Sequence, residues 1–136
     1  MEALHEIPGF SDYLKRYYLF NLSGGRKKVK VFLADILLVT AIKGSHAISI
    51  IYLRGNKRHK IRGHRLQEFI KITGFLIQVN KHELVSPDAV DYLDEDAIYL
   101  DGLKENNRPM YVALNRTYKK AFLDFFHYYE KDKKSK

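Results

Sequence analysis

The side chains that could carry chemistry in this 136-residue sequence form no catalytic or metal-binding pattern. Among the six histidines only His59 and His64 lie close together, and no third ligand of a suitable type is nearby. The acidic run Asp94–Asp96 lacks the glycine and the distal glutamate of a calcium-binding loop. No serine lies in a recognisable nucleophile motif, and cysteine is absent. The sequence therefore predicts a protein that is not an enzyme, with no catalytic residue, no metal site and no cofactor.

Two glycines open the basic run Gly24–Lys28, and such a loop could hold a phosphate if a helix began directly after it. No helical periodicity follows. Alternating apolar residues lie on the far side instead, which favours a tight β-hairpin turn. We therefore assign these glycines to a turn.

The net charge of +8 favours a polyanionic partner: DNA, RNA or an anionic membrane surface. The charges lie in blocks. Arg54–Arg65 holds six lysines or arginines and no acid, whereas Asp88–Glu105 holds seven acids and one lysine. Such segregation creates a one-sided electrostatic field, and we expect the basic block to attract phosphates without reading sequence.

The length is that of one domain, large enough to bury a core without metal or disulfide support. The N-terminal residues 1–18 are far too short for a receiver domain. No window approaches the roughly 18–20 apolar residues of a membrane-spanning helix, and the N-terminus lacks the pattern of a signal peptide. We expect a cytoplasmic protein with no membrane span. Residues 1–17 are expected to form a short N-terminal extension with a helical turn, 18–129 the domain, and 130–136 a flexible basic tail.

The first half of the domain shows the alternation of β-strands broken by turns. The apolar run Asp35–Ile42 is too continuous for a half-exposed strand and predicts a central one. Helical spacing then appears over Leu66–Thr73, and Gly74 suits a left-handed C-terminal cap. The other strands expected in this half are Tyr18–Leu22, Lys28–Leu33, Ala47–Leu53 and Arg58–Arg62.

The stretch Phe75–Leu93 predicts two strands on either side of a polar turn. The strands are Phe75–Val79 and Ala89–Leu93, with a short apolar anchor between the turn and Pro87. The turn Asn80–Glu83 consists of four polar residues that gain nothing from burial, so we expect an exposed tip.

The last part of the domain predicts two more strands, Ala97–Leu100 and Met110–Leu114, joined by a polar loop over Asp101–Pro109. From Asn115 the apolar residues recur at helical spacing, which predicts an amphipathic helix that docks on the sheet. The expected buried face is Tyr118, Ala121, Phe122, Phe125, Phe126 and Tyr129.

The stretch Phe75–Leu93 resembles the signature segment of the LytTR family, the DNA-binding domain of many bacterial response regulators. Phe75, Leu84, Val85 and Val90 lie in register with the apolar framework of that segment. The chain departs from the family's polar residues at Gln78, Asn80, Lys81, His82, Glu83 and Ser86.

The resemblance extends over roughly Tyr18–Phe126, because the order of strands and helices is also similar. Leu114–Lys119 is similar to the motif that enters the last helix of the family. The resemblance implies a mainly β (α+β) fold: antiparallel β-sheets in an elongated LytTR-like arrangement, with short helices and a C-terminal amphipathic helix.

The resemblance further implies a stand-alone bacterial transcription regulator that binds double-stranded DNA with sequence specificity. LytTR domains read major grooves through loops, and they dock on phosphates electrostatically. A second copy on a repeated site, and an unidentified regulatory protein, would be the further partners.

Three loop positions carry over from the family as DNA contacts: His46, Lys81 and Arg116. The neighbouring residues that complete the expected DNA-binding set are Lys43, Asn80 and Lys119.

Arg116 has support from the sequence itself. If Asn115 caps the last helix, Arg116 is its first residue, and a cation there opposes the helix macrodipole. A residue that is unfavourable for the local structure in this way points to a functional site.

A second interpretation stays open at this point: a β-rich binding module for RNA, an anionic membrane surface or a protein partner. Lys81 stands where the family has arginine, and lysine makes less directional contacts with base edges. Without the resemblance, the exposed cations would be ordinary solvated charges. A clear dependence of binding on duplex sequence separates the two interpretations.

Overall fold

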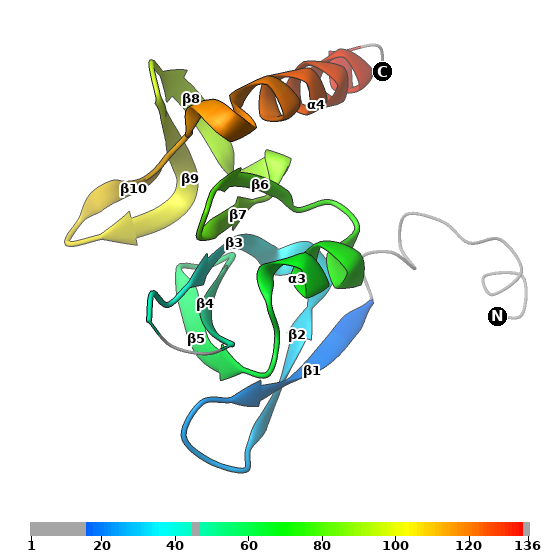
Figure 1. Cartoon of the computed structure of the whole chain (residues 1–136), viewed down its shortest axis with the longest axis vertical. Coiled ribbons are helices and arrows are strands. Elements are labelled where there is room, and N and C mark those ends of the chain that lie inside the picture. Colours follow the sequence, from blue (N-terminus) through cyan, green and yellow to red (C-terminus); the bar gives the residue numbers. More distant parts are fainter. Residues whose placement is uncertain (1–15, 45–46, 135–136) are drawn as a thin grey trace, which may run out of the picture.

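The computed structural model describes residues 16–44 and 47–134, with side chains through residue 127. Within these residues the chain forms two antiparallel sheets, two α-helices and two short 3-10 helices (Figure 1). The first sheet contains β1 (Tyr17–Leu22), β2 (Lys28–Phe32), β3 (Ile36–Ala41), β4 (Ile48–Leu53), β5 (Lys57–Arg62), β6 (Ile77–Asn80) and β7 (Glu83–Val85). The second contains β8 (Val90–Asp94), β9 (Ala97–Glu105) and β10 (Arg108–Ala113). The helices are α3 (Leu66–Thr73), α4 (Arg116–Lys134), η1 (Leu33–Asp35) and η2 (Pro87–Ala89).

The strand order of the first sheet is β2-β1-β5-β4-β3-β7-β6, so β3 and β4 lie inside it. The apolar run predicted to form a central strand is β3. Its neighbours Leu38 and Val39 are both fully buried, yet they belong to different cores. Successive side chains of a strand point to opposite faces, and β3 is covered on both, which explains why its sequence is continuously apolar.

The core on one face of the first sheet is closed by α3. Phe69 of α3 is fully buried there and stacks on Phe20 of β1 at 5.8 Å between ring centroids. The helix begins where Glu68 Oε1 accepts a hydrogen bond from the backbone N–H of Arg65 (2.9 Å), and this bond lowers the pKa of the Glu68 carboxyl. It ends at Gly74, whose φ of 80° is the left-handed cap that the sequence predicts.

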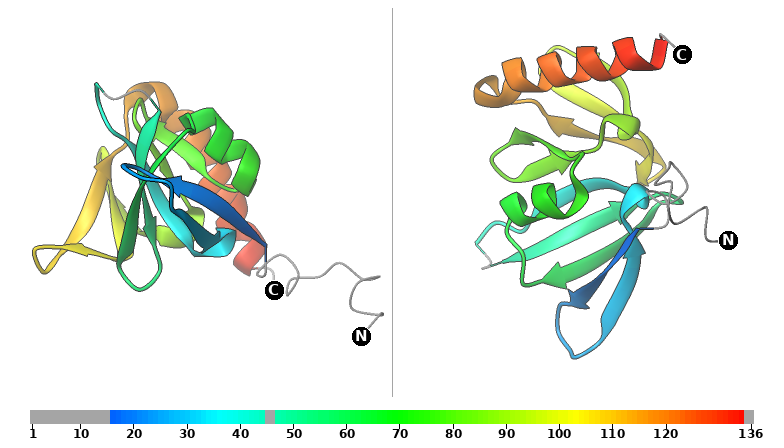
Figure 2. Two further views of the ribbon diagram at one scale, coloured as in Figure 1. Left: turned by 90° about the horizontal axis from the view of Figure 1, so that it is seen from below. Right: turned by 90° about the vertical axis from the view of Figure 1, so that its right-hand side faces the viewer.

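The other core lies between the first sheet, the second sheet (order β10-β9-β8) and α4. The two sheets follow one another along the long axis of the molecule, with α4 at one end and the β1–β2 hairpin at the other (Figures 1 and 2). The observed architecture is thus the mainly β, elongated arrangement with a C-terminal helix that the sequence predicts.

Helix α4 contacts this core through a narrower face than its sequence pattern suggests. Phe122 is 1% exposed and stacks on Phe126 at 5.7 Å. Phe125 is 41% exposed and Ala121 is also exposed, so their predicted burial is wrong. Leu123 packs against the core instead. The helix meets the rest of the domain along one side only, and residues at the margin of a wide apolar stripe therefore stay in solvent.

The described elements extend slightly past residues 18 and 129, the expected ends of the domain. Strand β1 begins at Tyr17. We expected a helical turn in residues 1–17, but residues 1–15 lie outside the described part of the chain. Helix α4 continues to Lys134, so the backbone from 130 to 134 is helical where we expected a flexible tail.

The polar loop expected over Asp101–Pro109 is a pair of strands with a short turn. β9 continues through Glu105, and β10 begins at Arg108. Within β9, Gly102 adopts a φ of +84°, which shifts the pleat, and the next residue, Leu103, is buried in the core.

The stretch around Pro87 divides between the two sheets. β6 and β7 form a hairpin at the edge of the first sheet. β6 begins at Ile77, two residues after the start of the predicted strand Phe75–Val79. The chain then passes through η2, which Ser86 caps by accepting a hydrogen bond from Asp88 N (3.3 Å), and β8 starts the second sheet.

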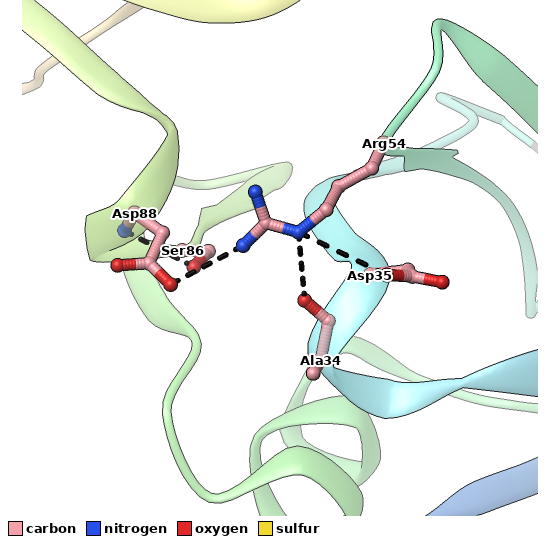
Figure 3. Close-up of polar contacts among 5 residues, drawn as sticks. All are labelled: Ala34, Asp35, Arg54, Ser86 and Asp88. Carbon is pink, nitrogen blue, oxygen red and sulfur yellow. Dashed lines mark hydrogen bonds and ion pairs between the residues drawn. The ribbon is translucent and has the colours of Figure 1, made fainter. Parts of the chain in front are cut away.

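Arg54 fastens this passage to the first sheet, as Figure 3 shows. Its guanidinium donates to Ala34 O and to Asp88 Oδ2, each at 3.3 Å, and lies 3.8 Å from Asp35 Oδ1. The three side chains are about half exposed, so each ion pair contributes only about 0–1 kcal/mol. Their combined effect is to hold η1 and η2 side by side.

Candidate nucleic-acid interface

Three turns meet at one edge of the molecule, where β3, β6 and β10 end (the left-hand edge of the right-hand view in Figure 2). The turn after β3 and the β6–β7 turn are joined because Ala41 N donates to His82 O at 2.8 Å. The entry to α4 is joined to β6 because Asn115 N donates to Val79 O at 2.9 Å. Two of the family-derived positions, Lys81 and Arg116, are far apart in sequence but therefore belong to neighbouring turns.

The side chain of Asn80 connects these turns through hydrogen bonds. Its Nδ2 donates to Ala113 O and to Glu83 Oε1, both at 2.9 Å, and its Oδ1 accepts from His82 N at 2.9 Å. Glu83 Oε2 in turn accepts from Thr40 Oγ1 at 2.8 Å. The side chain of Asn80 is thus committed to partners on three strands or turns.

The prediction that Asn80 belongs to an exposed tip is wrong, because the residue is 7% exposed. Burial of a polar side chain is stable only when its hydrogen bonds are made. Here Nδ2 finds one of its acceptors, Ala113 O, in the second sheet, which sequence analysis did not place beside β6. The spacing Asn-x-His was the available signal, since asparagine commonly accepts from the backbone N–H two residues ahead.

Replacing Asn80 with alanine is expected to lower the free energy of unfolding by about 1–3 kcal/mol, because Ala113 O and His82 N lose their partner. Chemical denaturation measures this. Lys81→Ala, at the exposed neighbouring position, is the control and should change stability by less than about 0.5 kcal/mol. Equal stability of Asn80→Ala and the parent would show that the turns are held together without it.

The cations of the first two turns are open to solvent. Lys43 follows β3 and Lys81 forms the tip of the β6–β7 hairpin; both are exposed. Neither makes a hydrogen bond or ion pair with the described part of the chain. His46, the third position expected here, lies outside the described residues.

Arg116 is the first residue of α4, as the sequence predicts. It is exposed and has no ion-pair or hydrogen-bond partner among the described residues, and it lines a hollow together with Asp96 and Asn115. A cation at this end of a helix is unfavourable to the macrodipole. No ion pair of Arg116 with the described part of the chain offsets that cost.

The two lysines behind Arg116 do have partners. Lys119 Nζ lies 3.0 Å from Asp96 Oδ1, and Lys120 Nζ lies 2.9 Å from Asp124 Oδ2. The hydrogen bond from Lys120 to Asp124 and the charge of that carboxylate raise the pKa of Lys120. Exposed ion pairs of this kind are weak, so a phosphate could still compete for Lys119.

The basic block on β5 is partly tied within the chain. Arg58 donates to Lys104 O at 3.2 Å and lies 4.9 Å from the ring of Tyr52, while Arg62 donates to Gly25 O at 3.3 Å. Lys60 is exposed on the strand between them. The block therefore retains surface charge next to the turn edge.

The outer face of the second sheet carries aromatic rings beside carboxylates, in contrast to the basic block on β5. Tyr92, Tyr99 and Tyr111 form a cross-strand row, with ring centroids 4.6 and 5.4 Å apart, and Tyr111 is 63% exposed. Loss of hydration, the neighbouring Tyr99 ring and the carboxylates of Asp91 and Asp94 raise the pKa of Tyr92. Carboxylates beside the row repel phosphate, so this face is not the candidate DNA surface.

Among the described residues, no group of three histidine, aspartate or glutamate side chains could hold a metal ion. No described helix is both long and apolar enough to cross a bilayer.

Comparison with known proteins gives no match in sequence but does give matches in structure. The sequence matches no family model and no curated protein. Its fold is similar to a solved structure described as the LytTr DNA-binding domain of a Bacillus cereus protein, with a TM-score of 0.60 and 13% sequence identity. The match covers 82% of this chain and 96% of the other. The chain therefore has a LytTR-type fold, as the resemblance in sequence implies.

Proposed function

We propose that this protein binds double-stranded DNA with sequence specificity and acts as a transcription regulator. The observation that carries the proposal is the meeting of three turns at one edge of a LytTR-type fold, each with an exposed cation: Lys43, Lys81 and Arg116. The structurally similar Bacillus cereus domain is described as DNA-binding, which supports the same assignment here.

The proposed mechanism has two parts. The net charge of +8 and the basic strand β5 bring the turn edge to the phosphate backbone, which positions the domain without reading bases. The turns then enter the major groove, where Arg116 can donate two hydrogen bonds to guanine O6 and N7. Lys81, Lys43, Lys119 and His46 supply less directional contacts, and Asn80 holds the turns in place. Two copies on a repeated site would extend the sequence that is read.

Salt dependence is the first test of this mechanism. If each domain neutralises a handful of phosphates, log affinity falls with log salt at about −0.9 per contact, or a slope of roughly −3 to −6. The measurement is a titration of a duplex selected from a random pool, repeated between low and physiological salt. A slope near zero would contradict electrostatic docking. Equal affinity for every duplex would contradict sequence specificity, and preference for single-stranded RNA or anionic vesicles would favour the other class of binding module.

A further inference from the structure

Two aromatic rings are exposed on one face of the β1–β2 hairpin, which forms one end of the molecule (Figure 1). Tyr17 is 53% exposed and Phe32 is 40% exposed, and they lie opposite each other on the two strands with ring centroids 6.3 Å apart. The next cross-strand pair on this face joins exposed Leu19 to Lys30. A contiguous group of exposed apolar side chains on one face is typical of a binding surface.

The opposite face of the same strands belongs to the core. Phe20 of β1, Val31 of β2 and Ile61 of β5 are buried there together with α3. Successive side chains of a strand point to opposite faces, so Tyr17 and Phe32 point away from this core. Core packing therefore does not explain why aromatic residues occupy the two positions.

The exposed face is continuous with the basic strand β5. Asn21 pairs with Lys28 on one side and with Arg62 on the other. Residues directly opposite each other in an antiparallel ladder share a face, and alternation along each strand adds Lys30 of β2 and Lys60 of β5 to it. All four cations are exposed. The face thus combines two aromatic rings with four cations.

The cations of this face are not neutralised by ion pairs. Three of the four have no ion-pair partner among the described residues, and the fourth, Arg62, donates to a backbone carbonyl, Gly25 O, at 3.3 Å. Strands β1, β2 and β5 contain no acid. Along β5 the face ends at Arg58, whose guanidinium lies 3.8 Å from Glu105 Oε1. The charge of the face therefore suits a polyanion.

Lys30 lies between the cations and the rings. Its Nζ is 4.5 Å from the centroid of the Tyr17 ring and 5.2 Å from that of Phe32. An exposed cation–π contact is weak, so a phosphate can draw the ammonium group away and leave the rings to a base. Proteins hold single-stranded nucleic acid with this combination, in which cations follow the phosphates and aromatic rings stack on the bases.

The rings distinguish a single strand from other polyanions. In a duplex the bases already stack on one another, and a flat sheet face meets phosphate and sugar, which need no aromatic partner. A bilayer surface takes up an apolar face that enters the acyl boundary, whereas the apolar residues here are three side chains on a charged sheet. Unpaired bases offer a π-face to each ring.

We propose that the face formed by β2, β1 and β5 binds single-stranded nucleic acid. Tyr17 and Phe32 stack on bases, and Lys28, Lys30 and Lys60 bind phosphates. The cations of β5 serve duplex docking as well, whereas the rings serve the single strand alone. This inference goes beyond the proposed function and does not depend on it.

The test measures the fluorescence anisotropy of labelled oligo(dT) and oligo(U) of about 16 nucleotides, the upper end of the length that a single domain usually binds. The parent should bind both oligomers, more weakly than its selected duplex. Tyr17→Ala/Phe32→Ala should bind them at least about 25-fold more weakly, since each stacked base contributes a factor of at least about five. Its affinity for the duplex should equal that of the parent, because no charge is removed. A loss on one oligomer alone would assign the site to that sugar.

Tyr92→Ala/Tyr111→Ala is the matched control. It removes two rings of similar exposure from the face of the second sheet that carries carboxylates, and it should bind both oligomers as tightly as the parent. A second variant, Tyr17→Leu/Phe32→Leu, retains apolar side chains on the hairpin but cannot stack. It should lose affinity as the alanine variant does, and it decides the result if the alanine variant has a lowered melting temperature.

The cations are tested with Lys28→Ala/Lys30→Ala. The slope of log affinity for the oligomers against log salt should become smaller by about 1.4, which is two phosphate contacts at about 0.7 each on a single strand. An unchanged slope would show that the two lysines contact no phosphate, and the proposed arrangement would be wrong.

Three further outcomes would overturn the inference while leaving the proposed function intact. The first is that both Tyr17/Phe32 variants bind the oligomers as tightly as the parent. The second is an equal loss in the Tyr92/Tyr111 variant. The third is that the Tyr17/Phe32 variants lose binding to phosphatidylglycerol vesicles but not to the oligomers, which would assign the face to a membrane surface. A parent that bound the oligomers through the rings but bound no duplex would contradict the proposed function and support this inference.

Discussion

Replacing Phe122 with alanine should lower the free energy of unfolding by about 3–5 kcal/mol. The ring is almost wholly buried between α4 and the two sheets, and it stacks on Phe126. Its removal costs the transfer free energy of the ring and leaves a cavity that the β-rich surroundings can only partly fill. Chemical denaturation followed by circular dichroism measures the change.

Phe125→Ala is the matched control for this prediction. It removes the same side chain from the same helix, but from a position that is 41% exposed. We expect a loss of less than about 1 kcal/mol there, because less apolar area returns to water. Similar losses for the two variants would show that α4 is not held to the core by the face centred on Phe122.

Replacing Arg116 with alanine should weaken binding to the selected duplex by about 1–3 kcal/mol. The melting temperature should stay unchanged or rise, because the substitution removes a cation that opposes the dipole of α4 and has no described partner within the chain. Titration of a panel of duplexes, each with one base pair changed, measures both the loss and its dependence on sequence. A contact with guanine confines the loss to one position, whereas a phosphate contact lowers affinity on every duplex.

Lys120→Ala is the control for Arg116→Ala. It removes a cation from the next turn of the same helix, where Asp124 already neutralises the charge, and we expect a much smaller effect on DNA binding. If Arg116→Ala bound the selected duplex as tightly as the parent, or if it unfolded easily, the third turn would not be a DNA contact.

The Phe122/Phe125 and Arg116/Lys120 pairs of variants test whether buried apolar residues and exposed cations have separate roles in the molecule. The apolar side chains of β3, β4, α3 and α4 make the scaffold, and the exposed cations lie on turns that the scaffold brings together. Binding residues of this kind can change without loss of the fold. That is consistent with a LytTR-type fold at 13% identity to the structure it resembles.

The sequence by itself determined the elements whose signals are local. The apolar run of β3 predicted a strand buried on both faces, and the spacing over Leu66–Thr73 with Gly74 predicted α3 and its left-handed cap. The glycines before Arg26 predicted the β1–β2 turn. Each of these follows from the conformational preferences of a few neighbouring residues, so no knowledge of distant parts of the chain was needed. The position of Arg116 at the start of α4 belongs to the same group.

Only the tertiary structure decided which residues are brought together and which faces are covered. Asn80 is buried because Ala113, which is 33 residues away, supplies an acceptor. Phe125 is exposed because α4 touches the domain along one side, and β9 continues past residue 100, where it pairs with β10 and places Leu103 in the core. The meeting of the turns after β3 and β6 at one edge follows from the strand order β2-β1-β5-β4-β3-β7-β6, in which β3 and β6 run in the same direction. Such pairings join segments distant in sequence through backbone hydrogen bonds, which every strand can make, and so residue type alone does not specify them.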